Sequence, residues 1–515
     1  MKKTALAIMI VTLISKTAGF VREVALSHFY GASAVTDAYF VSQTIPTVIF
    51  AFIGAGIGTG FIPMYSRITH TQGAEAANRF TSNLVTTLCV LCTIIVGVSS
   101  IFSGPLVRLF ASGFTGETLD LATRFTRISV FAIYFTGLSG LVGGYLRIHE
   151  SYLVPNMVAI PSNLIIIIAL VISSTTDIHV LLIGTVVGKA SELLFPALFA
   201  RKKGYRYAVI FDLGDENLRT MIRIAIPVIV GTSMTQINVI VDRALASGIE
   251  VGGISALNYA NRLTTFVEGL FVMSTASVMY PMISKMASSQ RIELLRNAVS
   301  ESIGLINFMV VPVAVGAVVL AEPIVNLLFG HGAFTADASA MTSTALQFYS
   351  LGMLAFGMRE IVIRAFYALQ ETQTPMIYGA VAVAMNIALN IVLSRYLGIG
   401  GLALATSISG VVGTALLILA LRKKIGGFGI KQLGMSCAKI CASSMVMGGI
   451  SLALYICLGR AVGATESLVL AVLAGAVVYF GVAWVLRVPE AERAVTAVKH
   501  LIEQRRPRPS SSRRA

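Results

Sequence analysis

Long apolar segments recur along the whole chain, and short polar segments separate them. Each apolar segment has roughly 20 residues, which is the length that a helix needs to cross a hydrocarbon core of about 30 Å. Fourteen such segments centre near Ile10, Ile49, Leu91, Tyr134, Ile165, Val186, Val230, Val272, Val310, Leu354, Ala384, Val411, Gly448 and Val472. The pattern therefore predicts an all-α integral membrane protein with fourteen transmembrane helices.

The first twelve segments read as two copies of one pattern of six. Four landmarks recur at a nearly constant offset: Arg201-Lys202-Lys203 as Arg422-Lys423-Lys424, Tyr145 as Tyr367, Pro155 as Pro375, and Pro63-Met64 as Pro281-Met282. Because six spans return the chain to its starting side, we expect parallel repeats. The predicted domains are an N-lobe at 1–203, a C-lobe at 204–424, two extra spans at 425–488, and a basic cytoplasmic tail at 489–515.

Composition and charge agree with a membrane protein. The 515 residues are 56% hydrophobic and 12% charged, with a mean hydropathy of +0.82, which excludes an ordinary soluble domain. With the N-terminus in the cytoplasm, 26 of the 39 basic residues fall in inner loops and tails, whereas the outer loops hold Arg108, Arg395 and Arg460. This asymmetry predicts cytoplasmic N- and C-termini. It also explains the net charge of +15 without nucleic acid, and we expect the tail to lie against anionic lipid headgroups.

Two sequence patterns favour packing over chemistry. Cys89-x-x-Cys92 lies in an apolar run with no second ligand pair, so packing is favoured over a metal or redox site. Glycines alternate with other residues from Gly54 to Gly60 in the second span. Small residues at i and i+4 favour close helix packing, and a helix that bends is the alternative.

Charged residues inside the predicted spans give the first functional signal. Each basic residue at a helix centre costs about 2.5–3.5 kcal/mol on insertion scales. The predicted spans contain ten basic residues: Lys16, Arg22, Arg124, Arg127, Lys189, Arg243, Arg262, Arg359, Arg364 and Lys439. They contain only about six acidic residues: Glu23, Asp37, Glu192, Asp242, Glu268 and Glu360. The surplus predicts a wet, cationic cavity for an anionic ligand.

Some of these cations have a structural alternative. Arg124, Arg127 and Lys439 are near span ends, where their side chains can reach the headgroups, and Arg359 can pair with Glu360. Lys16, Arg22 and Arg262 are the strongest candidates for ligand binding. Guanidinium groups form bidentate hydrogen bonds with phosphate, so a pyrophosphate would suit them.

A second set of polar residues has a different chemistry. Asp242, Asn386, Asn390 and Thr406 lie in predicted spans of the second copy. Their carboxylate, amide and hydroxyl oxygens suit a small, hard cation. Interhelical hydrogen bonding is the alternative.

Several motifs resemble a known family. They are Ser15-Lys16-Thr17-Ala18-Gly19-Phe20-Val21-Arg22-Glu23, Phe29-Tyr30-Gly31-Ala32-Ser33, Thr36-Asp37-Ala38-Tyr39-Phe40, Tyr259-Ala260-Asn261-Arg262-Leu263, Phe329-Gly330-x-Gly332-x-Phe334, and Ala365-Phe366-Tyr367-Ala368-Leu369-Gln370 with Thr372, Thr374 and Pro375. Together they resemble the MurJ/MviN family of bacterial lipid II flippases, from the first span through the twelfth. That family's fold of two six-helix lobes plus two helices agrees with the predicted layout.

The resemblance implies a substrate and site residues. The substrate is undecaprenyl-pyrophosphate carrying a disaccharide-pentapeptide, and we expect it to contact Lys16, Arg22, Glu23, Asp37, Arg262 and Arg364. The resemblance also implies a sodium site formed by Asp242, Asn386, Asn390, the carbonyl of Leu402, and Thr406. Lys16 replaces a common arginine, Glu23 a common aspartate and Asn390 an aspartate, while Phe50-Ala51 replaces an arginine pair of some members.

We therefore predict a monomeric lipid II flippase of the bacterial inner membrane that works by alternating access. It would make and break no bond, so it would not be an enzyme, and its only cofactor would be a candidate sodium ion. The nearest alternatives are transporters for another polyprenyl-linked glycan or a small cation. A membrane glycosyltransferase disagrees with the short loops and the scattered histidines.

Overall fold

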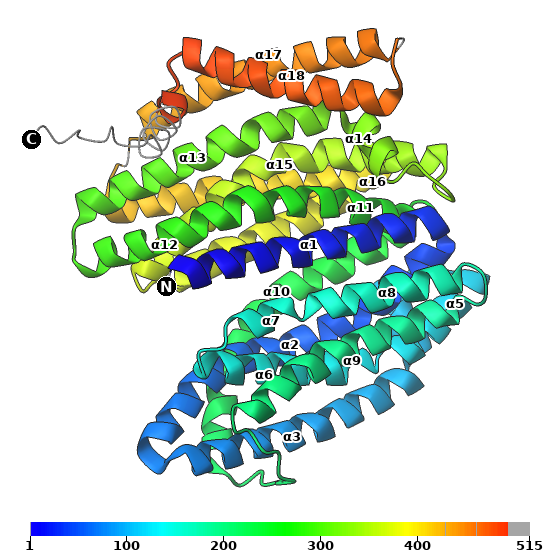
Figure 1. The fold of residues 1–515 in the computed structure, drawn as a ribbon, viewed down its shortest axis with the longest axis vertical. Coiled ribbons are helices and arrows are strands. Elements are labelled where there is room, and N and C mark those ends of the chain that lie inside the picture. Colours follow the sequence, from blue (N-terminus) through cyan, green and yellow to red (C-terminus); the bar gives the residue numbers. More distant parts are fainter. Residues whose placement is uncertain (1, 428, 460, 493–515) are drawn as a thin grey trace, which may run out of the picture. The chain divides into compact units, whose positions relative to one another are not determined.

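The computed structural model describes residues 2–427, 429–459 and 461–492, and this part of the chain contains helices and no strand (Figure 1). Most of the predicted basic tail, 493–515, lies outside the described residues. All fourteen predicted span centres fall within helices. The all-α fold class is therefore confirmed.

Nine α-helices lie between residues 2 and 202. Their bounds are α1 Lys2–Tyr30, α2 Ala34–Gln72, α3 Ala74–Ile101, α4 Ser103–Phe110, α5 Gly116–Ser129, α6 Ala132–Ile148, α7 Leu153–Met157, α8 Ala159–Ser173 and α9 His179–Lys202. The remaining helices are α10 Glu216–Ser247, α11 Gly253–Val267, the π-helix η1 Glu268–Val272, α12 Met273–Ser288, α13 Ile292–Val319, α14 Ala321–Leu328, α15 Ala336–Ala368, α16 Gln373–Ile425, α17 Ile430–Leu458 and α18 Ala464–Val485.

Ten helical segments of the described chain are long and apolar enough to cross a membrane, and α10 gives an eleventh if its two stretches count as one span. Those two stretches, Glu216–Ile229 and Gly231–Ser247, are bent by 48°. Helix α16 runs for 53 residues and contains the predicted eleventh and twelfth spans, which meet at Gly398. The total of fourteen spans stays a prediction.

Left-handed backbone residues recur at nearly the spacing of the sequence repeat. Positive φ angles occur in matched pairs, which are Gly31 with Gly252, Gly73 with Gln290, Gly116 with Gly332, Glu150 with Gln370, and Gly204 with Gly426. The short helices α4 and α14 have eight residues each and begin at matching places, Ser103 and Ala321. Because a left-handed residue commonly ends a helix, these positions place the same corners in both copies.

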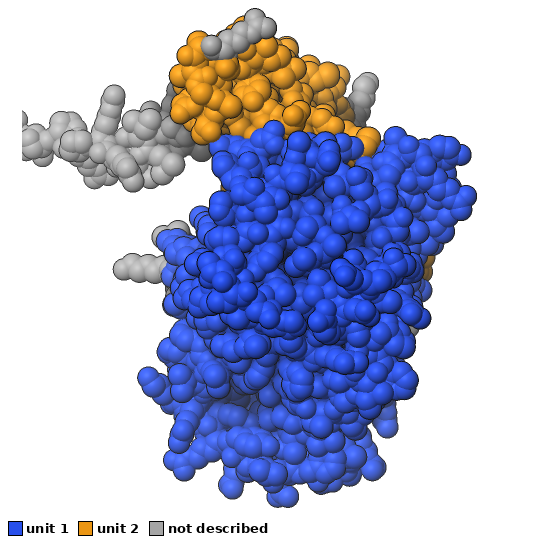
Figure 2. All heavy atoms as spheres, turned by 90° about the vertical axis from the view of Figure 1, so that its right-hand side faces the viewer, with its two compact units in different colours: residues 1–262, 325–345, 383–406 blue, residues 263–324, 346–382, 407–515 orange. Residues whose placement is uncertain are grey.

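The described chain divides into two compact units (Figure 2). Unit 1 comprises 1–262, 325–345 and 383–406, and unit 2 comprises 263–324, 346–382 and 407–515. The core of unit 1 includes Phe61, Phe80 and Tyr145, and a core of unit 2 includes Ile306 and Phe366. The predicted lobe boundaries at 203 and 424 follow the repeat and stay a prediction.

The glycines of α2 allow α10 to approach closely. A Cβ on Gly56 would lie 2.7 Å from the Cβ of Ala225, and one on Gly60 would lie 3.0 Å from Met221. By contrast, a Cβ on Gly58 would meet nothing within 4 Å. The predicted close packing is confirmed for Gly56 and Gly60, and both helices belong to unit 1.

Candidate functional site

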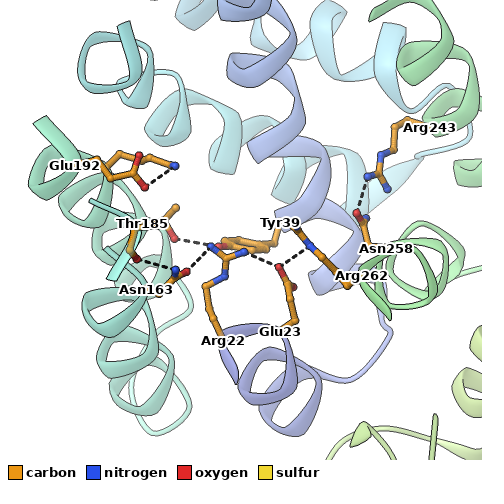
Figure 3. Close-up of polar contacts among 11 residues, drawn as sticks. Arg22, Glu23, Tyr39, Asn163, Thr185, Glu192, Arg243, Asn258 and Arg262 are labelled. Carbon is orange, nitrogen blue, oxygen red and sulfur yellow. Dashed lines mark hydrogen bonds and ion pairs between the residues drawn. The ribbon is translucent and has the colours of Figure 1, made fainter. Parts of the chain in front are cut away.

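Glu23 joins two of the predicted arginines. One oxygen of its carboxylate, Oε1, lies 2.6 Å from Nη2 of Arg22 on the same helix and 3.3 Å from Nε of Arg262 on α11 (Figure 3). The Glu23 side chain is 2% exposed. We call Arg22, Glu23 and Arg262 the arginine–carboxylate cluster, and its three charges sum to one positive charge.

The cluster keeps hydrogen-bonding capacity for a ligand. The side chains of Arg22 and Arg262 are 23% and 50% exposed, and each guanidinium has five N–H donors. The second oxygen of Glu23, Oε2, is buried and has no hydrogen-bond partner among the described residues. The cluster can therefore donate to an anion through its arginines, and it contains one unpaired carboxylate oxygen that a ligand would reach only after the surrounding side chains move.

Asn163 orients the guanidinium of Arg22. Nη1 of Arg22 donates to Oδ1 of Asn163 on α8 at 3.1 Å, and Nδ2 of Asn163 donates to the carbonyl of Ala159 at 2.7 Å (Figure 3). Asn163 was not among the residues predicted from the sequence. Its only signal was an amide just before the apolar run that starts at Leu164.

Asp37 holds the start of α11. Its Oδ2 accepts from the backbone N–H of Gly252 at 2.7 Å, and its Oδ1 accepts from the N–H and the hydroxyl of Ser255 at 2.8 and 2.5 Å. The residue is 1% exposed. Asp37 therefore fixes the helix that carries Arg262, and both of its oxygens are engaged in this structure.

The other two predicted substrate residues have separate surroundings. Lys16 is exposed on α1, six residues before Arg22. Arg364 on α15 pairs with Glu360, with 2.8 Å between Nη2 and Oε1, and its guanidinium carbon lies 5.6 Å from the ring centroid of Tyr280. The ion pair of Glu360 is thus with Arg364, one turn away, whereas the sequence had suggested Arg359.

The five predicted cation ligands form one chain of hydrogen bonds. Nδ2 of Asn390 lies 2.5 Å from Oδ1 of Asp242 and 2.9 Å from Oδ1 of Asn386. The chain continues from Nδ2 of Asn386 to Oγ1 of Thr406 at 3.3 Å, and from Thr406 to the carbonyl of Leu402 at 3.0 Å. We call these five residues the oxygen cluster.

The chemistry of the oxygen cluster fits a small monovalent cation. Asn386 and Asn390 are buried, and Oδ1 of Asn390 has no hydrogen-bond partner among the described residues. The donors are one carboxylate, amide and hydroxyl oxygens and a carbonyl, which are hard ligands with a single negative charge. Asn238, which the sequence analysis missed, donates from Nδ2 to Oδ2 of Asp242 at 3.1 Å. The one sequence feature that could have indicated Asn238 is its spacing of one helical turn from Asp242.

Solved structures of transporters share this fold. The structure described as "Lipid II flippase MurJ, inward closed conformation" matches with a TM-score of 0.81 and 26% identity, over 93% of this chain and 98% of that chain. An inward-facing multidrug resistance MATE family transporter of the MOP superfamily matches with a TM-score of 0.69 and 16% identity, over 82% and 98%. The second likeness concerns the fold alone.

Sequence relatives cover nearly the whole chain. The protein "Probable lipid II flippase MurJ" of Rhizobium tropici is 26% identical over 98% of this chain and 97% of its own length. The protein of the same description from Thermotoga maritima is 26% identical over 97% and 99%. The profile of the family "Lipid II flippase MurJ" matches residues 26–474. This chain therefore belongs to the MurJ family of lipid II flippases.

Proposed function

We propose that this chain moves lipid II from the inner to the outer leaflet of the bacterial cytoplasmic membrane by alternating access. Family membership supports the substrate. The observation that carries the proposal is the arginine–carboxylate cluster, in which two arginines with partly exposed side chains share one buried carboxylate. The protein is a transporter and not an enzyme.

The cluster would bind the pyrophosphate of lipid II. Arg22 and Arg262 would donate paired hydrogen bonds to phosphate oxygens, which is the geometry that a guanidinium favours. Glu23 would hold the two like charges together before the substrate arrives. Its free oxygen could then accept a hydrogen bond from a sugar hydroxyl.

The remaining predicted residues would have supporting roles. Lys16, exposed on the same helix as Arg22, would add positive charge for the headgroup. Asp37 would position Arg262 through α11. Arg364 would contact the substrate only if it leaves Glu360, because that carboxylate already occupies its guanidinium.

The oxygen cluster would hold a sodium ion. Asp242, Asn386, Asn390, the carbonyl of Leu402, and Thr406 would supply the ligands, and a bound ion would place one positive charge beside the carboxylate of Asp242. Asn390 would first have to turn its amide nitrogen away from Asp242, so that its free oxygen could face the ion.

The proposed layout has fourteen spans, an N-lobe and a C-lobe that rock against each other, and both termini in the cytoplasm. The polyprenyl tail would stay in the lipid while the headgroup crosses between the lobes. We propose that a monomer performs the whole cycle, since the chain itself supplies both lobes.

Complementation tests the proposed function. Cells depleted of their own flippase would receive this chain, and lipid II exposed on the outer surface would be measured. We expect the unaltered chain to restore exposure and the Arg22→Ala and Arg262→Ala variants to fail at equal membrane levels. Arg108→Ala, which removes an exposed arginine far along the chain from the cluster, serves as the matched control. Growth and lipid II exposure with both cluster variants would reject the site.

A further inference from the structure

Arg243 is a cation within a membrane helix that the arginine–carboxylate cluster does not include. It follows Asp242 directly on α10, and consecutive helix residues point about 100° apart. Asp242 contacts Asn390 on α16. Arg243 instead contacts α11: Nη2 donates to Oδ1 of Asn258 at 2.8 Å, and Nη1 donates to the carbonyl of Ile254 at 3.3 Å (Figure 3). One turn of α10 is thereby tied to two different helices.

Asn258 connects Arg243 to the face of α11 that carries Arg262. Asn258 and Arg262 are four positions apart, so their side chains lie on the same face of α11. Asn258 is itself fixed, because its Nδ2 donates to the carbonyl of Ile254 at 3.0 Å. Arg262 then contacts Glu23. The route from the oxygen cluster to the arginine–carboxylate cluster thus consists of the contacts of Asp242, Arg243 and Arg262, and helix α11 itself carries the step from Asn258 to Arg262.

Helix α11 is held at its start by a separate contact. Asp37 accepts hydrogen bonds from the backbone N–H groups of Gly252 and Ser255. One Arg243 contact, to the carbonyl of Ile254, lies within this held segment, and the other, to Asn258, lies three residues beyond it. A shift of Arg243 would therefore act on α11 beyond the held segment through Asn258. The part of α11 that moves would be the part that carries Arg262.

Charge gives a reason for Arg243 to respond to a cation. An ion held by Asp242 would place a second positive charge next to the guanidinium on the following residue, and like charges repel. The ion would also displace the amide of Asn390 from Asp242. Both changes act at the turn of α10 from which Arg243 reaches α11.

We propose that Arg243 is the positioning residue that couples the oxygen cluster to the arginine–carboxylate cluster. Arg22 and Arg243 have the same separation along the chain as the left-handed corners Gly31 and Gly252, so each copy of the repeat has an arginine at this place. The inference rests on the proposed sodium site and the proposed substrate. It assigns to Arg243 a role in communication and not in binding either ligand.

A coupling measurement tests the proposal. The full chain in nanodiscs is titrated with lipid II in sodium chloride and in potassium chloride of equal ionic strength, and sodium-induced thermal stabilisation is measured separately. We expect the two lipid II affinities of the unaltered chain to differ by about 5–150-fold, which is the usual range of coupling between sites. In Arg243→Gln the ratio of the lipid II affinities in sodium and in potassium should approach one, while sodium still raises the unfolding temperature.

Further variants separate coupling from simple loss of structure. Asn258→Ala should lower the ratio as Arg243→Gln does, and the double variant should lower it no further. Arg243→Lys should show a ratio between those of the unaltered chain and Arg243→Gln, because lysine retains the positive charge but lacks the paired N–H donors of the guanidinium. Arg127→Gln, which removes a different span cation whose Nε donates to Oγ of Ser103, is the matched control and should keep the full ratio.

The outcomes distinguish this proposal from those on which it rests. If Arg243→Gln and Asn258→Ala keep the full ratio, the role of Arg243 is refuted. A ratio of one in the unaltered chain, together with stabilisation by sodium, refutes the coupling and leaves the sodium site. If sodium does not stabilise the unaltered chain, the sodium site and the coupling are both refuted. If lipid II does not bind at all, the proposed function itself is refuted.

Discussion

Replacing Asp37 with alanine should destabilise the fold through the start of α11. The carboxylate accepts three hydrogen bonds, two from backbone N–H groups and one from the hydroxyl of Ser255. The site is buried, with Asp37 1% exposed and Ser255 0% exposed. Alanine would leave the N–H groups of Gly252 and Ser255 without their acceptor.

The magnitude follows from the two abandoned donors. An unpaired buried polar group costs about 1–3 kcal/mol, so Asp37→Ala should lower the free energy of unfolding by about 2–6 kcal/mol. Asp37→Asn keeps the size and one acceptor oxygen, but it turns an amide NH₂ toward an N–H donor. We expect that variant to lose about 1–3 kcal/mol, which is the cost of one unmade bond.

Thermal unfolding in detergent micelles, followed with a thiol-reactive dye, can measure the effect. Cys457 is exposed in the folded state and sets the baseline, whereas Cys92 is 1% exposed, so the rise in labelling above that baseline reports loss of the folded state. Asp177→Ala is the matched control, because Asp177 also accepts from a backbone N–H at a helix start, that of His179 at 2.8 Å, but is exposed. Its unfolding midpoint should stay close to that of the unaltered chain. Equal midpoints for Asp37→Ala and Asp177→Ala would refute the reasoning.

Three further predictions concern the cluster, the α2–α10 contact and the cation site. Glu23→Gln should lower the free energy of unfolding by about 1.5–3 kcal/mol, since a charge-assisted bond is lost, and combining it with Arg262→Gln should cost less than the sum in thermal unfolding. Gly56→Ala should destabilise the fold by about 1–3 kcal/mol through overpacking. Gly58→Ala, whose Cβ meets nothing within 4 Å, should stabilise it by about 0.5–1 kcal/mol. Similar thermal unfolding midpoints for the two variants would contradict the close packing of Gly56. Asn390→Asp should enlarge the stabilisation by sodium over potassium at equal ionic strength, and an unchanged difference would count against Asn390 as a ligand.

The hydrophobic pattern was enough to predict the helices that contain the span centres, and recurring basic, tyrosine and proline residues predicted the internal repeat. Each predicted span centre falls in a helix because a run of about 20 apolar residues has few other stable conformations in lipid. The number of spans is harder to read from the helices. A single left-handed residue, Gly398, separates two predicted spans inside α16, and the helix is otherwise continuous.

The candidate site was predictable where charge marked it. Arg22 and Arg262 were identified because ionised residues are rare in apolar segments, the family resemblance added Glu23, and the structure brings the three together. Asn163 and Asn258 were missed because a neutral amide costs less in a membrane helix and carries no charge signal. The partners of Asp37 are mainly backbone N–H groups, which no sequence pattern displays.

The recurring left-handed corners have a consequence for how the two copies diverged. Fixed corners keep equivalent helices at equivalent places in each copy, so the side chains between corners were free to change. In the first copy, α1 contacts α8 through Arg22 and Asn163. In the second, α10 contacts α16 through Asp242 and Asn390. Equivalent helix pairs of the two copies thus carry two different chemistries within a single polypeptide, a cationic contact in the first and an oxygen-rich contact in the second.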